Sequence, residues 1–211
     1  GHCRHHGLDR SFNSGSRRPR FISRHPRTWL ILLPVTDLPV EDVIDELRLA
    51  LAQRLTAVLV APPGAGKTTL IPLRLINEDW LSGQRIVMLE PRRLAARAAA
   101  RRLASLIGQE PGELVGYQTR DERCIGPNTR IEVVTEGILT RRLQNDPELP
   151  GIGLVIFDEV HERNLPTDVG LALCLDARKN LRPDLRVLAM SATADTDRFA
   201  KLLGDGEPAP I

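Results

Sequence analysis

Residues 57–69 read Ala-Val-Leu-Val-Ala-Pro-Pro-Gly-Ala-Gly-Lys-Thr-Thr, an apolar run that passes through a glycine-containing loop into a helical segment. An apolar strand followed by a helix is the unit from which parallel sheets are built. The chain repeats this unit, because further apolar runs alternate with stretches whose apolar residues recur at helical spacing. The sequence therefore predicts an α/β fold, with a mostly parallel sheet covered by helices on both faces.

The strand and helix predictions follow this alternation along the whole chain. Strands are predicted at residues 57–61, 85–89, 115–118, 130–135, 153–157 and 185–190. Helices are predicted at residues 67–77, 94–107, 136–145, 168–180 and 195–203, preceded by one that starts near Pro39 and runs to Leu55. Ligands of such sheets bind beyond the carboxyl ends of the strands, and each motif described below follows such an end.

The loop at 61–69 has the composition that binds a nucleoside triphosphate. A glycine-containing turn at a helix N-terminus offers converging backbone amides, and a lysine supplies the compensating charge. Lys67 is expected to reach the β- and γ-phosphates, and the Thr68 hydroxyl to complete a Mg²⁺ shell. The nucleotide contacts are expected from Pro63, Gly64, Ala65, Gly66, Lys67, Thr68 and Thr69. A plain strand-to-helix turn is the alternative, since Ala61 stands where the strict pattern has glycine.

An apolar run at 154–157 ends in Asp158-Glu159-Val160-His161. Asp158 is placed to hold Mg²⁺, and Glu159 to orient and deprotonate an attacking water. An Asp-Glu pair after a strand is often only a solvated turn, but the phosphate loop upstream favours the catalytic interpretation. His161 is the only histidine in residues 37–211 and is assigned to the same site, with a chance surface histidine as the alternative. Ser191 and Thr193, after the last predicted strand, are candidates for coupling the state of this box to other parts of the protein.

Charge is unevenly distributed along the chain. Residues 1–36 hold seven arginines and one acid, whereas residues 37–211 hold 22 basic and 26 acidic residues. Residues 37–211 carry a net negative charge, so any contact of this part with nucleic acid is expected from a local patch rather than from bulk charge. Residues 1–36 mix Gly, Ser, Pro, Arg and His, and we interpret them as a disordered or foreign basic tail, with a nucleic-acid-binding arm as the alternative.

The cysteines and the apolar runs indicate in which cellular compartment the protein is expected. Cys3, Cys124 and Cys174 are odd in number and widely spaced, which favours reduced thiols and a cytoplasmic location over a disulfide framework. The longest apolar run, Trp29–Leu33, is far shorter than the roughly 18 residues of a membrane helix, so no membrane contact is expected. A secretory signal is not expected, because no long apolar stretch precedes a small-residue cleavage site.

Five short motifs together resemble motifs I, Ia, Ib, II and III of superfamily-two helicases, in order and spacing. They are Ala61–Thr69, Pro91-Arg92-Arg93-Leu94-Ala95-Ala96, Thr135-Glu136-Gly137, Asp158–His161 and Ser191–Thr193. The fuller phrases around them resemble the bacterial HrpB branch of the DEAH-box RNA helicases over about residues 37–205. The acidic box departs from the group's name, since valine stands where the name has alanine.

This resemblance implies two stacked RecA-like P-loop NTPase domains, with ATP and Mg²⁺ in the cleft between them and single-stranded RNA across their top. Residues 37–211 match the first domain, and the second, which carries the arginine fingers, is expected beyond them. The residues carried over to the RNA side are Pro91, Arg92, Arg93, Thr135, Glu136 and Gly137. Arg102 is the candidate for stacking on adenine, with Arg101 as an alternative, while a solvated basic turn is the alternative for Arg92 and Arg93.

The sequence thus predicts the ATP-binding half of an ATP-dependent RNA helicase, an enzyme when joined to its second domain and nearly inactive alone. Two other classes stay open. One is a DNA-directed P-loop translocase or another P-loop enzyme. The other is an isolated nucleotide- or RNA-binding module without turnover.

Overall fold

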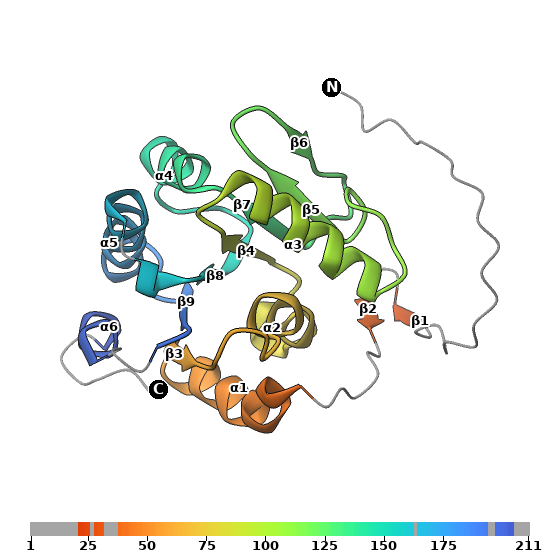
Figure 1. Ribbon diagram of the computed structural model, residues 1–211, viewed down its shortest axis with the longest axis horizontal. Coiled ribbons are helices and arrows are strands. Elements are labelled where there is room, and N and C mark those ends of the chain that lie inside the picture. The colour runs from red at the N-terminus through yellow and green to blue at the C-terminus, as the bar shows by residue number, and fades with distance from the viewer. Residues whose placement is uncertain (1–20, 26–27, 32–37, 163, 194–196, 205–211) are drawn as a thin grey trace.

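The computed structural model describes residues 21–25, 28–31, 38–162, 164–193 and 197–204. Its centre is a seven-stranded sheet in the order β3-β9-β8-β4-β7-β5-β6 (Figure 1). All neighbouring strands of this sheet run parallel except β5 and β6, which pair antiparallel. The predicted fold class, a mostly parallel α/β sheet, is confirmed.

The strands of the main sheet are β3 Thr56–Val60, β4 Arg85–Leu89, β5 Val115–Gln118, β6 Arg123–Cys124, β7 Ile131–Val134, β8 Ile152–Phe157 and β9 Arg186–Ser191. The α-helices are α1 Ile44–Gln53, α2 Lys67–Leu75, α3 Arg93–Leu106, α4 Glu136–Asn145, α5 Leu165–Asn180 and α6 Asp197–Leu203. Three short 3₁₀ helices are η1 Pro39–Val43, η2 Asp79–Leu81 and η3 Val160–Glu162. Among the described residues, no helix is long and apolar enough to cross a membrane.

In the described part of the chain, helices cover both faces of the sheet, with α1, α2 and α3 on one face and α4, α5 and α6 on the other (Figure 1). Side chains alternate between the two faces along a strand. On β8, Leu154 and Ile156 therefore pack in the cluster under α1, α2 and α3, while Val155 and Phe157 pack in the cluster under α4, α5 and α6. All six residues of β8 are buried, which explains why its sequence is continuously apolar.

Three elements differ from the sequence prediction. The helix expected from Pro39 begins as η1 and becomes α-helical only at Ile44. Helix α5 begins at Leu165, three residues earlier than predicted, because the Asn164 side chain accepts a hydrogen bond from the Thr167 amide at 2.8 Å and caps its N-terminus. Strand β6 was not predicted, since two residues are too short to show a period.

The region interpreted as a basic tail contains a two-stranded antiparallel sheet, β1 Phe21–His25 and β2 Thr28–Ile31. No regular element was predicted there, because the segment was interpreted from its Gly, Ser, Pro, Arg and His content, although the apolar run at 29–33 overlaps β2. Most of residues 1–36, Cys3 included, lie outside the described residues. Cys124 is disulfide-bonded, so the prediction of reduced thiols is wrong for it, whereas Cys174 is a free, buried thiol.

Glu132 is a buried carboxylate within β7 that joins three neighbouring elements. Its two oxygens accept hydrogen bonds of 2.7 Å from Arg85 of β4 and from Arg142 of α4. The carboxylate is 1% exposed, so its charge is stabilised almost entirely by these two guanidinium groups. This network fixes α4, and with it the loop that follows β7, against the sheet.

Glu132→Ala should lower the free energy of unfolding by about 1–3 kcal/mol, because both guanidinium groups lose a buried acceptor but remain partly hydrated. Urea unfolding followed by circular dichroism measures the change. Glu148→Ala, at an exposed position, is the control and should leave stability nearly unaltered. An equal midpoint for both variants would contradict the structural role of Glu132.

Candidate active site

The phosphate loop connects β3 to α2 with the backbone conformation that its glycines permit. Gly64 and Gly66 have φ angles of +80° and +98°, in the left-handed region that favours glycine. A Cβ on Gly66 would lie 2.9 Å from Leu38 Cδ1, so this position also lacks room for a larger residue. The Val40 amide donates to the Ala65 carbonyl at 3.3 Å, so the start of η1 supports the loop from outside.

Lys67, the first residue of α2, is only 4% exposed although it carries a charge. Its ammonium group donates to the carbonyls of Ala61 and Pro62 at 2.5 and 3.2 Å. These acceptors are neutral, so they fix the direction of the side chain without neutralising its charge. A buried and only partly compensated cation beside free helix N-terminal amides attracts an anion such as a phosphate.

Thr68 and Asp158, 90 residues apart in sequence, meet at the carboxyl end of the sheet. The Thr68 hydroxyl donates to Asp158 Oδ2 at 2.6 Å, and Asp158 is 0% exposed. Burial raises the pKa of Asp158 to about 6, while the Thr68 hydrogen bond opposes the rise and the Glu159 carboxylate adds to it. The two segments that the sequence assigns to one site are therefore in direct contact.

A hydroxyl and a carboxylate side by side suit Mg²⁺, which prefers hard oxygen ligands. Within the described residues, no group of three or more His, Cys, Asp or Glu side chains could hold a metal ion by itself. Mg²⁺ is commonly bound by one or two protein oxygens together with substrate phosphates and water, so Thr68 and Asp158 fit a metal that arrives with a nucleotide.

Glu159 has a left-handed backbone conformation, with a φ of +52°, which is uncommon for a residue with a side chain. Its amide donates to Asp158 Oδ1 at 2.9 Å, and this bond offsets part of the backbone strain. The turn directs the two neighbouring carboxylates apart, so that Asp158 is buried while Glu159 is partly exposed. One strand end thus presents two acids in different environments, as a metal ligand and a general base require.

His161 is contacted from two sides at one nitrogen atom. The Ala192 amide donates to its Nδ1 at 3.2 Å, and Glu159 Oε2 lies 3.3 Å from the same atom. Nδ1 must carry a lone pair for the first contact and a proton for the second, so the two contacts exclude each other. Which of the two contacts is a hydrogen bond therefore depends on whether Nδ1 carries the proton.

Ser191 and Thr193 contact each other rather than the acidic box. The Ser191 hydroxyl donates to the Thr193 carbonyl at 3.0 Å and accepts from the Thr193 amide at 3.1 Å. The Ser191 carbonyl accepts from the Ala61 amide at 3.1 Å, which ties this segment to the start of the phosphate loop. Ser191 and Thr193 were the candidates for coupling to the acidic box. In the structure, the contact from this segment to the box is made by the Ala192 backbone amide, which donates to His161.

Sequence reasoning missed Glu90, a carboxyl group at the end of β4 that is 7% exposed. Burial raises its pKa to about 7, and the neighbouring Asp158 carboxylate adds to the rise. The Arg92 amide donates to Glu90 Oε1 at 3.4 Å, a long and weak contact. A single acid after an apolar strand gave no signal of its own, because its proximity to Asp158 depends on the pairing of β4 with β8.

The residues expected on the RNA side follow two neighbouring strands, β4 and β7, which pair in parallel. Pro91, Arg92 and Arg93 come after β4, and both arginines are exposed. Thr135 follows β7 and is 8% exposed, and Glu136 accepts a 2.9 Å hydrogen bond from the Thr167 hydroxyl. Gly137 is exposed, and a Cβ there would meet nothing within 4 Å. The two sets thus lie at the same edge of the sheet, and their role in binding RNA stays a prediction.

Arg102 and its alternative Arg101 are exposed on α3. Neither has a described contact with the phosphate loop, so stacking on adenine stays a prediction.

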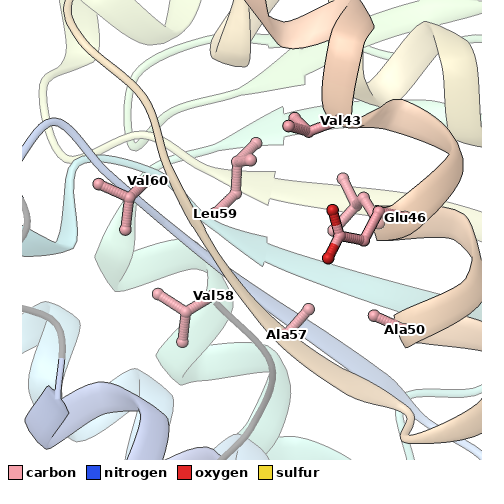
Figure 2. A pocket seen from close by; sticks show the side chains of 8 residues that line it. Val43, Glu46, Ala50, Ala57, Val58, Leu59 and Val60 are labelled. Atoms are coloured by element: carbon pink, nitrogen blue, oxygen red, sulfur yellow. The ribbon is translucent and has the colours of Figure 1, made fainter.

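A pocket between α1 and β3 is lined mostly by apolar side chains, among them Leu47 and Leu59, with Glu46 at one side (Figure 2). It lies beside the strand that leads into the phosphate loop and contains none of the loop residues. The pocket is therefore separate from the candidate active site.

A mostly parallel sheet, a phosphate loop after β3 and an acidic box after β8 together define a RecA-like P-loop NTPase domain. Residues 41–202 match the DEAD/DEAH box helicase family. The chain belongs to this family.

Within this family, the chain is similar to several RNA helicases. It is 54% identical to the ATP-dependent RNA helicase HrpB of Escherichia coli K12 over 80% of the chain and 21% of HrpB. It is 39% identical to the ATP-dependent RNA helicase DHX30 of Gallus gallus, over 79% of the chain and 14% of DHX30. A crystal structure of the E. coli DExH-box NTPase HrpB matches with a TM-score of 0.77 and 50% identity, covering 85% of this chain and 22% of that one. The chain thus spans about a fifth of the length of HrpB.

Glu90→Gln should stabilise the protein at alkaline pH. Because folding raises the pKa of Glu90 from about 4.5 to about 7, its contribution to stability is fully present below pH 4.5 and is lost as the pH rises through 7. The neutral glutamine avoids this loss and should add about 1–3 kcal/mol at about pH 8, most of which disappears near pH 5. Urea unfolding at both pH values measures the difference, with Glu110→Gln as an exposed control. Equal stability of wild type and variant at pH 8 would contradict the assignment.

Proposed function

We propose that this chain binds Mg²⁺ and ATP at the phosphate loop and, as part of a longer protein, couples ATP hydrolysis to movement on single-stranded RNA. The observation that carries the proposal is the 2.6 Å hydrogen bond between Thr68 and Asp158, which joins the phosphate loop to the acidic box. The names of HrpB and DHX30 as ATP-dependent RNA helicases support ATP and RNA as the ligands.

The residues of the chain divide the work on ATP between them. Lys67 and the amides at the start of α2 bind the phosphates, while Thr68 and Asp158 hold Mg²⁺. When bound, the metal neutralises phosphate charge. Glu159 orients the attacking water and accepts its proton, and His161 transmits the state of the box to the segment after β9 through the Ala192 amide.

RNA is proposed to bind across the carboxyl ends of β4 and β7. The guanidinium groups of Arg92 and Arg93 suit phosphates, and the Thr135 hydroxyl can donate to another. Contacts of this kind position a nucleic-acid backbone and do not distinguish bases. The expected ligand is therefore a single strand of unrestricted sequence.

Hydrolysis at a useful rate is proposed to need a second RecA-like domain that supplies arginine fingers, since an arginine finger contributes roughly 10³–10⁵ in rate. The 211-residue chain alone should bind nucleotide and turn it over very slowly. We propose the cytoplasm as its compartment, because ATP and RNA are both available there.

Lys67→Ala should weaken binding of Mg·ATP by roughly 10- to 100-fold, because the phosphates lose a charge-assisted hydrogen bond worth about 1.5–3 kcal/mol. Titration with a fluorescent ATP analogue measures the affinity. Lys179→Ala removes the same charge from the exposed end of α5 and should bind as the wild type does. Undiminished affinity of the Lys67 variant would contradict the nucleotide site.

Glu159→Gln, made in the longer protein that contains this domain, should reduce RNA-stimulated hydrolysis by roughly 10²–10⁴ while nucleotide still binds. Phosphate release in the presence of RNA or of single-stranded DNA of the same base sequence measures both the rate and the preferred nucleic acid. Glu148→Gln, distant from the loop, is the matched control. Retained turnover would favour a binding module, and stimulation by DNA alone would favour a DNA translocase.

A further inference from the structure

Both arginines after β4 are engaged by carboxylates from other parts of the chain. Arg92 donates to Glu162 Oε1 at 2.8 Å, and Arg93 forms a very short ion pair with Asp121. The arginine side chains are nevertheless 71% and 64% exposed. Each guanidinium group is thus held in position by an acid and is also accessible to a ligand from solvent.

Asp121 lies in the turn between β5 and β6, and this turn is fixed to α3. The neighbouring Glu122 forms a 2.7 Å ion pair with Arg97, one turn after Arg93 along α3, and accepts from the Tyr117 hydroxyl at 3.1 Å. Hydrogen bonds between Thr119 and Glu122, of 2.8 and 3.2 Å, close the turn itself. The turn that carries Asp121 is therefore held in place beside Arg93 by these contacts of Glu122.

Glu162 belongs to η3, which directly follows the acidic box. Its amide donates to the Glu159 carbonyl at 2.9 Å, so its backbone is coupled to the proposed general base. Arg92 thereby connects the end of β4 with the segment that carries Glu159 and His161. The two acids differ in this respect, because Asp121 has no described link to the acidic box.

We propose that Asp121 and Glu162 act as internal substitutes for phosphate, and that a single-stranded RNA backbone displaces them from Arg93 and Arg92 when it binds. This inference rests on the proposed function, which assigns both arginines to RNA. Carboxylates and phosphates present the same charge and similar oxygen geometry to a guanidinium group, so the two anions compete for it. Exposed ion pairs of this kind are weak, so a phosphate can replace the acid.

The exchange has two consequences. RNA must compete with an acid that is already in place, so each internal carboxylate lowers the affinity for RNA. Displacement of Glu162 also removes a contact to the segment that follows the acidic box, whereas displacement of Asp121 leaves its turn held by the Glu122–Arg97 ion pair. Asp121 is thus an affinity-setting residue, and Glu162 additionally links RNA contact to the nucleotide site.

The test measures binding of a fluorescein-labelled oligouridylate to the full chain by fluorescence anisotropy at low salt. Asp121→Asn and Glu162→Gln should each bind it roughly two- to fivefold more tightly than the wild type, as loss of a weak competing ion pair allows. Glu148→Gln removes the same charge at the opposite end of the sheet and controls for net charge. In an Arg93→Ala background, Asp121→Asn should have no further effect, because the competition passes through that arginine.

The results expected for the variants separate support for the proposed displacement from its failure. Tighter binding by Asp121→Asn that disappears in the Arg93→Ala background supports the inference, as does RNA binding that appears only in the variants. Unchanged or weaker binding by both variants, or an equal gain in the Glu148 control, overturns it while leaving the proposed RNA site intact. Absence of RNA binding by the wild type and by both variants overturns the inference, and the same titration with the longer protein that contains this domain then tests the proposed RNA function separately. Thermal unfolding of each variant establishes that the fold is retained.

Discussion

The site depends on the hydrogen bond from Thr68 to Asp158, and this bond depends on strand order. The phosphate loop follows β3 at the edge of the sheet, the acidic box follows β8, and β9 lies between them. The Ala61 amide extends the β3–β9 pairing by one hydrogen bond to Ser191, after which the loop crosses above the end of β9. Ser191 and Ala192, which occupy that end, are small.

The carboxyl end of the sheet also gathers several buried ionisable groups whose charges are only partly compensated by neighbouring groups. Lys67, Glu90 and Asp158 are nearly buried, and burial raises the pKa of both acids. The left-handed backbone of Glu159 adds strain at the same position. A bound cation and phosphates would relieve the repulsion between the acids and satisfy the lysine, so ligand binding and local stability are linked. The arrangement is typical of functional sites, which carry local strain that the surrounding core compensates.

The sequence predicted the features whose chemistry is local. The phosphate loop and the acidic box each combine an apolar strand with polar residues at fixed positions, and parallel strands end at one edge of a sheet, so Lys67 and Asp158 could be assigned to one site from their sequence context alone. Contacts set by strand order could not be predicted in this way. Glu132 reaches Arg85 because β7 pairs with β4, and Asp121 reaches Arg93 because the turn between β5 and β6 lies beside the start of α3. Strand β6 was missed because two residues are too few to show a period. The hairpin at residues 21–31 was missed because the composition of residues 1–36 favoured a tail without regular structure.

The 3₁₀ turn η3 receives contacts from both sides of the proposed site. His161 accepts the Ala192 amide from the end of β9, and Glu162 holds Arg92 from the end of β4. The Nδ1 atom of His161 accepts from the Ala192 amide only when it is unprotonated and donates to the Glu159 carboxylate only when it is protonated, so the two contacts cannot both be hydrogen bonds at the same time. A displacement of the Arg92 side chain would act on the same turn, because Arg92 pairs with Glu162. Coupling between distant ligands requires an element with two arrangements that both ligands bias, and η3 is the element that contacts both the end of β9 and the end of β4.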